Sequence, residues 1–263
     1  MRSISGMTVL ITGASSGIGE ALAGELHRRG ARLALAARRA DRLATVAARC
    51  GGAAQLVCDV GDSAAAERCV HQAHAALDRL DTVVLNAGYG LARSAETTSD
   101  EAWLAILRVN LLGTAAGLRA AVPLMRAQPL QGGWRGQVMI VSSSLGRRAA
   151  PDTAAYSASK AAQLSLAEAA RVELASERIA VTSVHPVRTT TPFFDTCAKV
   201  SGRKMEFRGR VPTQTPEQVA RAMADAIARP RPEVWPHRST RWLASLATFC
   251  PSLADRIMAG HRR

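Results

Sequence analysis

Short apolar segments alternate with longer amphipathic segments along almost the whole chain, and this alternation constrains the fold most strongly. The apolar segments are rich in β-branched residues and predict strands at residues 7–12, 32–37, 55–58, 82–86, 137–142 and 179–185, and less clearly at 233–235. The amphipathic segments predict helices at about 17–29, 40–49, 62–78, 99–127, 153–177 and 215–228. Apolar strands separated by helices form parallel sheets covered on both faces. We therefore predict an α/β fold with a doubly wound parallel sheet.

No low-complexity linker divides the sequence, so we expect one domain over residues 1–263. Residues 187–212 interrupt the alternation, because they show no clear period and have only Phe193, Phe194 and Phe207 as apolar anchors. Long irregular segments after a strand are often binding loops. We expect a substrate loop here, with a simple surface excursion as the alternative.

The formal net charge of +13 is dominated by arginine, with 31 arginines and 3 lysines. Residues 199–263 hold 13 basic and 5 acidic residues, so +8 of the charge lies in the last quarter. We interpret the charge as a solvated surface and expect no nucleic-acid partner. An acidic substrate, an acidic carrier protein or a membrane surface near the C-terminal segment are the alternatives.

Several classes of protein do not fit the composition. No segment approaches the ~20 apolar residues that a membrane-spanning helix needs, and the first residues lack the apolar core and cleavage site of a secretory signal. We therefore expect a cytoplasmic protein. The five cysteines are scattered and have no CxxC spacing, which indicates reduced thiols and no metal site.

The C-terminal extension, residues 236–263, has an apolar stripe beside several arginines and is interrupted by Pro251. The stripe consists of Trp242, Leu243, Leu246, Phe249, Leu253 and Ile257. Such a stripe describes both an ordinary docking helix and a helix that lies on a membrane surface. We favour packing against the core or another subunit over membrane contact.

The sequence TGASSGIG at residues 12–19 follows the first predicted strand and opens the first predicted helix. Gly13 can enter a turn that other residues avoid, Gly17 lets the backbone approach a pyrophosphate, and Gly19 lets the helix pack closely on the strand. The helix N-terminus offers free N–H groups and partial positive charge to an anion. This combination predicts a phosphate-binding turn for a dinucleotide.

The turn resembles the nucleotide-binding motif of the short-chain dehydrogenases/reductases, and five further segments of that family follow along the chain. These are Cys58-Asp59-Val60, Asn86-Ala87-Gly88, Val109-Asn110-Leu111-Leu112-Gly113, Ser142-Ser143-Ser144-Leu145-Gly146 and Tyr156-Ser157-Ala158-Ser159-Lys160. The resemblance implies a single-domain, Rossmann-type doubly wound sheet. It also implies an oxidoreductase that uses a nicotinamide dinucleotide to interconvert a carbonyl and an alcohol on a small molecule.

By the same resemblance, the cofactor-binding residues come from the turn and from the ends of the later strands. Asp59 is expected to contact the adenine ring, and Pro186 and Thr191 are expected as secondary contacts. The complete expected set is Gly13, Ser15, Ser16, Gly17, Ile18, Gly19, Arg38, Asp59, Val60, Asn86, Ala87, Gly88, Tyr156, Lys160, Pro186 and Thr191.

The end of the second predicted strand bears on which dinucleotide binds. Binders of NAD usually have an acidic residue there for the ribose 2′-hydroxyl, but this chain has Arg38 and Arg39. A guanidinium can bind a 2′-phosphate with paired hydrogen bonds. Arg38 resembles the arginine that selects NADP in the family, and Ser15 could donate to the same phosphate. We predict a preference for NADP(H) without excluding NAD(H).

Tyr156 and Lys160 are four residues apart and share one face of a predicted helix. A nearby ammonium group stabilises a phenolate, so we expect Lys160 to lower the pKa of Tyr156 toward the working range of an acid/base catalyst. The resemblance further implies that Lys160 binds the nicotinamide ribose and that the Asn110 region holds water of a proton relay.

Ser143 has the spacing to Tyr156 of the family's serine, which hydrogen-bonds the substrate oxygen. Its neighbours Ser142 and Ser144 have the same hydroxyl chemistry, so the choice of Ser143 among the three serines depends on this spacing. The catalytic residues that the resemblance implies are therefore Asn110, Ser143, Tyr156 and Lys160.

The chain departs from the family after the sixth strand, where Pro186 is followed by Val187 in place of glycine. Valine does not adopt a positive φ without strain, so we expect the loop beside the nicotinamide to run differently. The run of three threonines leaves the register of Thr191 uncertain. His185 is interpreted as a packing residue at the strand end.

Two further alternatives concern function and assembly. A catalytically silent dinucleotide-binding module, acting in regulation or partner binding, would not need the four catalytic residues, so we favour an enzyme. The resemblance implies a homodimer or homotetramer built from the helices at 99–127 and 153–177. The apolar faces of those helices could equally cover the sheet.

Overall fold

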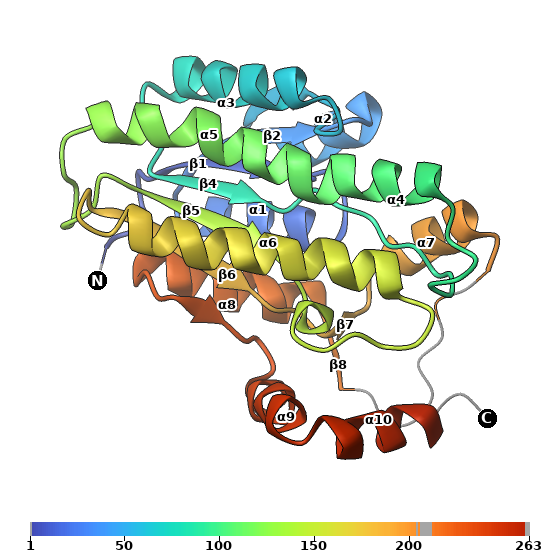
Figure 1. The fold of residues 1–263 in the computed structure, drawn as a ribbon. Coiled ribbons are helices and arrows are strands. Elements are labelled where there is room, and N and C mark those ends of the chain that lie inside the picture. Colours follow the sequence, from blue (N-terminus) through green and yellow to red (C-terminus); the bar gives the residue numbers. More distant parts are fainter. Residues whose placement is uncertain (1, 204, 206–211, 261–263) are drawn as a thin grey trace.

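The fold is built on one parallel sheet of seven strands in the order β3-β2-β1-β4-β5-β6-β9. The computed structural model describes residues 2–203, 205 and 212–260. The strands are β1 (Thr8–Thr12), β2 (Arg32–Ala37), β3 (Ala54–Val57), β4 (Thr82–Leu85), β5 (Gly136–Val141), β6 (Ile179–Val184) and β9 (Glu233–Val234). The predicted α/β fold with a doubly wound, Rossmann-type sheet is confirmed (Figure 1).

Helices cover both faces of the sheet. One layer consists of α1 (Gly17–Arg28), α2 (Ala40–Arg49) and α8 (Pro216–Ala228). The other consists of α3 (Ser63–Leu77), α5 (Gly113–Ala127) and α6 (Ala154–Glu173). Successive strand residues point to opposite faces, so Val9 packs with the first layer and Leu10 with the second. Both faces of the central strands are therefore buried in apolar cores, as the continuous apolar segments predict.

The predicted helix at 99–127 contains a change of helical type. Helix α4 (Asp100–Leu107) leads into a π-helical turn, η1 (Arg108–Leu112), before α5 begins. The run Asp100–Ala127 is long and apolar enough to cross a membrane by length and composition, contrary to our expectation that no such segment exists. Half of its most apolar stretch is buried, and its α5 portion packs against the sheet and α3.

Residues 187–212 contain more regular structure than expected. Strand β7 (Arg188–Thr189) pairs with β8 (Thr213–Gln214) in a small parallel sheet, and α7 (Phe193–Ser201) follows β7. The prediction of an irregular segment is wrong for residues 193–201, which form α7. This helix has only nine residues, so its apolar positions repeat too few times for a helical period to be recognised in the sequence. Phe207 lies outside the described residues.

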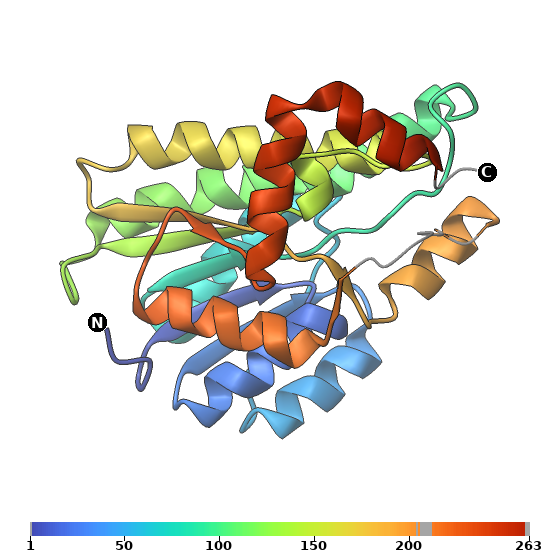
Figure 2. The ribbon, with the colours of Figure 1, turned by 90° about the horizontal axis from the view of Figure 1, so that it is seen from below.

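The C-terminal extension forms two helices, α9 (Arg238–Phe249) and α10 (Pro251–Gly260), which lie below the sheet layers in the view of Figure 1. Figure 2 shows the same pair from below. Trp242 is 76% exposed and Phe249 83% exposed. The prediction that the apolar stripe packs into the core of this chain is therefore wrong for Trp242 and Phe249. Contact of the stripe with another subunit or with a membrane remains a prediction.

Candidate active site

A cavity of about 950 Å³ opens at the carboxyl ends of the central strands. It is lined by residues that follow β1, β2, β4, β5 and β6, including Gly13, Arg38, Asn86, Ser142 and Pro186. The strand order reverses between β1 and β4, and ligands of doubly wound sheets bind in the crevice at this switch point. The cavity therefore lies where the fold itself places a binding site.

The glycine-rich turn at one end of the cavity has no room for side chains. Gly13 has φ +68°, and a Cβ there would lie 2.9 Å from the Cα of Ala87. A Cβ on Gly19 would lie 2.4 Å from the carbonyl oxygen of Gly13. Asn86 fixes the turn, because its Nδ2 donates to the carbonyl of Thr12 at 2.9 Å. The turn and the start of α1 at Gly17 fit the phosphates of a dinucleotide.

The two arginines after β2 have different surroundings. Arg39 Nη2 donates to the hydroxyls of Ser15 at 3.0 Å and Ser16 at 2.8 Å, on the glycine-rich turn. Arg38 instead lies 3.6 Å from the carboxylate of Asp59, the residue expected at the adenine ring. Both arginines line the cavity, so Arg38 stays the predicted phosphate contact and the structure adds Arg39 as a second candidate. Two adjacent arginines carry the same chemistry, and the sequence alone does not distinguish them.

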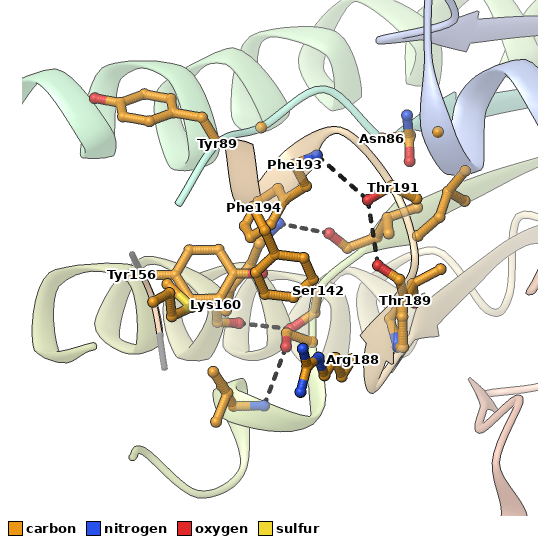
Figure 3. A pocket seen from close by; sticks show the side chains of 18 of the residues that line it. Asn86, Tyr89, Ser142, Tyr156, Lys160, Arg188, Thr189, Thr191, Phe193 and Phe194 are labelled. Carbon is orange, nitrogen blue, oxygen red and sulfur yellow. Dashed lines mark hydrogen bonds between the residues drawn. The ribbon is translucent and has the colours of Figure 1, made fainter. Parts of the chain in front are cut away.

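Tyr156 lies at the other end of the cavity, on the buried face of α6, and is 7% exposed. Burial raises the pKa of Tyr156 to about 12, and the neighbouring Ser143 side chain acts in the opposite direction. The structure also separates the three serines. Ser142 donates to the carbonyl of Lys160 at 2.8 Å, whereas Ser143 is the serine whose side chain interacts with Tyr156. The spacing in the sequence thus selects the serine beside Tyr156, and Figure 3 shows Tyr156, Lys160 and Ser142 in the cavity.

Lys160 does not act on Tyr156 as expected in this structure. Its Nζ donates to the carbonyl of Val141 and to Oε1 of Gln163, both at 2.8 Å, and lies 5.8 Å from the centroid of the Tyr156 ring. Burial lowers the pKa of Lys160 to about 7. The expectation that Lys160 lowers the pKa of Tyr156 is wrong here, because loss of hydration dominates for both groups.

Gln163 is a buried partner of Lys160 behind the cavity that was not predicted from the sequence. It is fully buried one helical turn after Lys160, accepts from that ammonium group, and donates to Thr114 Oγ1 at 2.7 Å. Thr114 in turn donates to the carbonyl of Asn110 at 2.8 Å. A buried polar residue on the same face as the catalytic pair was the available signal. This chain of hydrogen bonds joins α6 to the π-helical turn.

Asn110 lies in that π-helical turn and is completely buried. Its Oδ1 accepts from the backbone N–H of Tyr89 at 3.1 Å, and its Nδ2 donates to the Tyr89 carbonyl at 3.1 Å and to Ser159 at 2.9 Å. Asn110 is not among the described residues that line the cavity. Its side chain joins the loop after β4 to α6 and so holds Tyr89, which lines the cavity, in place.

The loop after β6 accommodates Val187 without strain. Val187 is not among the described residues with a positive φ. His185 is fully buried, stacks on Trp235 at 4.4 Å and lies 3.0 Å from the Ser183 hydroxyl, so its interpretation as a packing residue is supported. Burial lowers the pKa of His185 to about 4. Thr191 lies against the glycine-rich turn, since its Cβ would be 3.2 Å from a Cβ at Gly17.

Aromatic and aliphatic side chains line the part of the cavity beyond Tyr156, which we call the outer chamber. Phe193 packs on Tyr156 with ring centroids 5.5 Å apart, and Phe194 follows it (Figure 3). Leu243 of α9 and Ile257 of α10 also line the cavity. Phe193, Phe194 and part of the C-terminal stripe thus line one cavity, although they lie far apart in the sequence.

Comparison with known proteins agrees with this geometry. A model of the short chain dehydrogenase family matches residues 7–200. The chain belongs to this family of oxidoreductases. The 11-beta-hydroxysteroid dehydrogenase-like 4A protein of Arabidopsis thaliana is 33% identical over 95% of this chain and 83% of its own length. A Drosophila melanogaster dehydrogenase/reductase, SDR family protein 7-like, is 31% identical over 97% of this chain and 80% of its own length.

Solved structures of the short-chain dehydrogenase family match over nearly the whole fold. The 3-ketoacyl-(acyl-carrier-protein) reductase of Brucella melitensis, complexed with NADH, gives a TM-score of 0.79 with 28% identity and covers 90% of this chain and 100% of its own. A Burkholderia phymatum short-chain dehydrogenase/reductase in complex with NAD gives a TM-score of 0.83 at 22% identity, over 97% of each chain, and shows the shared fold. This chain is therefore a short-chain oxidoreductase of a family that uses nicotinamide dinucleotides.

Proposed function

We propose that the protein is an NADP(H)-dependent oxidoreductase that interconverts a carbonyl and an alcohol, with Tyr156 as the acid/base. The observation that carries the proposal is that Tyr156 and the Ser143 side chain beside it line the same cavity as the glycine-rich turn. Two neighbouring hydroxyls suit hydrogen bonding to one substrate oxygen. The turn suits the phosphates of the dinucleotide, which supplies or accepts the hydride when bound.

The two hydroxyls divide the work on the substrate oxygen. In reduction, Ser143 donates a hydrogen bond to the carbonyl oxygen, and Tyr156 transfers its proton to that oxygen as hydride reaches the carbonyl carbon. A pKa of about 12 keeps Tyr156 protonated at neutral pH, and an alkoxide is a stronger base than a phenolate, so this transfer is favourable. Oxidation of the alcohol reverses both steps.

The preference for NADP(H) is supported by Arg38 and Arg39 at the end of β2. Arg39 already donates to two serine hydroxyls of the turn, and its guanidinium can form paired hydrogen bonds with a 2′-phosphate. The similar solved structures contain NADH or NAD, so the preference depends on these arginines rather than on the comparisons. The expected contact of Asp59 with adenine is supported by its position in the lining of the cavity.

Assembly into a homodimer or homotetramer is a second part of the proposal. Helix α5 buries one face against the sheet, while Leu104 and Leu112 on the same helical run and Val172 on α6 remain exposed. One face of α5 thus covers the sheet, and the apolar residues left outside support the proposal of assembly. Sedimentation or gel filtration measures the size directly.

The activity is tested by oxidation of NADPH and NADH with a panel of ketones and aldehydes, alongside calorimetric binding of both cofactors. We expect turnover with NADPH, and we expect Tyr156→Phe to reduce kcat by about a hundredfold or more while NADPH binding is retained. Tight NADPH binding without turnover on any carbonyl would instead support the catalytically silent module. Full activity of the phenylalanine variant would exclude Tyr156 as the acid/base.

A further inference from the structure

A continuous aromatic path leads from the catalytic tyrosine to a cation. Phe193 packs on Tyr156 with ring centroids 5.5 Å apart, and Phe194 packs edge-on against Phe193 at 5.4 Å. The guanidinium carbon of Arg188 lies 5.8 Å from the centroid of the Phe194 ring. Arg188 is the first residue of β7 and lines the same cavity, and Figure 3 shows it on the Phe194 side of the pocket.

Arg188 differs from the other arginines of the outer chamber in its charge balance. Arg203 forms an ion pair with Asp152 at 2.9 Å, and Arg148 forms a close ion pair with Asp255. Among the residues that the structure describes, Arg188 has no carboxylate within ion-pair distance. Within the described part of the outer chamber, Arg188 is thus a cation without an ion-pair partner.

An apolar wall joins Tyr156 to Arg188, in a cavity that is also lined by polar residues such as Ser144, Thr196 and Arg203. Phe193 and Phe194 form one side, and Leu145, Leu243 and Ala247 also line the cavity. Binding pockets of this kind orient a ligand through a few polar groups on a largely apolar surface. Along this wall, the Tyr156 hydroxyl stands at one end and the guanidinium of the solvent-exposed Arg188 at the other. A guanidinium pairs with carboxylate or phosphate oxygens through two hydrogen bonds.

We infer that the substrate is an anionic carbonyl compound, in which an apolar body separates the carbonyl from a carboxylate or phosphate group that binds Arg188. This inference rests on the proposed role of Tyr156 and adds the substrate class to it. The long arginine side chain places the anion at the mouth of the pocket, so the apolar body of the substrate lies along Phe193 and Phe194.

The test compares keto acids of increasing chain length with their methyl esters, using NADPH and the full-length chain. For the acid of best-fitting length, we expect Arg188→Gln to lower kcat/KM by about tenfold to a hundredfold, mainly through KM, because one charge-assisted hydrogen-bonded pair is lost. The ester should be nearly unaffected, and Arg188→Lys should retain part of the preference. Keto phosphates form a second arm that distinguishes the two anions.

Arg221→Gln on the exposed face of α8 is the control for loss of one positive charge, and it should leave the ratio of acid to ester unchanged. Equal losses for acid and ester in Arg188→Gln, or no preference for any anion in the wild type, would overturn the inference. Unchanged KM for NADPH in Arg188→Gln separates the substrate role from cofactor binding.

Calorimetry separates this inference from the proposed function. The hydroxy acid and its methyl ester are titrated into the protein in the presence of NADP+. Selective binding of the acid that Arg188→Gln abolishes supports the anion site even if no carbonyl is turned over, in which case the proposed reaction fails alone. Equal binding of acid and ester by the wild type contradicts the anion site while leaving the reaction intact.

Discussion

Arg39 donates a hydrogen bond to Ser16 at 2.8 Å, so its guanidinium lies directly beside the glycine-rich turn. Arg38, its neighbour, is turned toward Asp59. We therefore expect Arg39→Asp to change cofactor preference more than Arg38→Asp. The ratio of kcat/KM for NADPH to that for NADH should fall by about tenfold to a hundredfold, because a charge-assisted pair is lost and a like charge is introduced.

Arg42→Asp is the matched control for that experiment, because Arg42 is an exposed residue of α2 that does not line the cavity. It should leave the ratio unchanged. A larger change in Arg38→Asp than in Arg39→Asp would return the selecting role to Arg38. An unchanged ratio in both variants would mean that the preference for NADP(H) is wrong.

The buried ammonium group of Lys160 predicts a pH dependence of stability. Burial lowers its pKa to about 7 in the folded state, compared with roughly 10.4 for an exposed lysine. Between these values the unfolded chain binds more protons, so the free energy of unfolding rises with pH, by at most about 1.4 kcal/mol per pH unit. Below the folded pKa both states are protonated, and the folded state bears the full cost of burial.

Lys160→Met removes this dependence. Urea unfolding at pH values between the two pKa values should therefore show a wild type that gains stability relative to the variant as pH rises. Lys199→Met is the control, since Lys199 is exposed on α7 and should follow the wild-type slope. Parallel slopes for wild type and Lys160→Met would show that Lys160 is not desolvated in the folded chain.

Gln163 is expected to set the charge state of Lys160 through the 2.8 Å hydrogen bond between them. Gln163→Leu removes an acceptor from the ammonium group, so the alkaline limb of the activity profile should move to lower pH. Gln163→Glu adds a negative charge, which favours the ammonium form and should move that limb to higher pH. Opposite shifts support a positioning role, whereas a structural role alone would change kcat without moving the profile.

Much of the fold was predictable, because the signals lie in local periodicity. The strands ended within about two residues of their predicted positions, since the apolar runs of the central strands are buried on both faces. The π-helical turn around Asn110 was not predictable, because it inserts into an unbroken apolar period. Helix α7 was missed because nine residues give too few repeats.

The candidate site divides in the same way. Gly13, Gly19, Ser143 and Tyr156 could be located because the motifs give their order and the turn requires glycine. Arg39 and Gln163 could not, because their roles depend on the direction of a side chain after the backbone is placed. The meeting of Phe193 with α9 and α10 depends on tertiary packing alone. The sequence therefore predicts the motif residues around the glycine-rich turn and Tyr156 better than the residues that line the outer chamber.

Asn110 offers a last prediction, because its side chain satisfies both backbone groups of Tyr89 from a fully buried position. Asn110→Leu keeps the volume but leaves a partly buried N–H and a partly buried carbonyl unpaired, each at a cost of up to about 1–3 kcal/mol. We expect a loss of several kcal/mol in urea unfolding and weaker NADPH binding, since Gly88 and Tyr89 line the cavity. Arg108→Ala, at an exposed position of the same turn that does not line the cavity, should change neither. If Asn110→Leu were as stable as the wild type but lacked turnover, Asn110 would act in the chemistry itself rather than as the fastening of the loop.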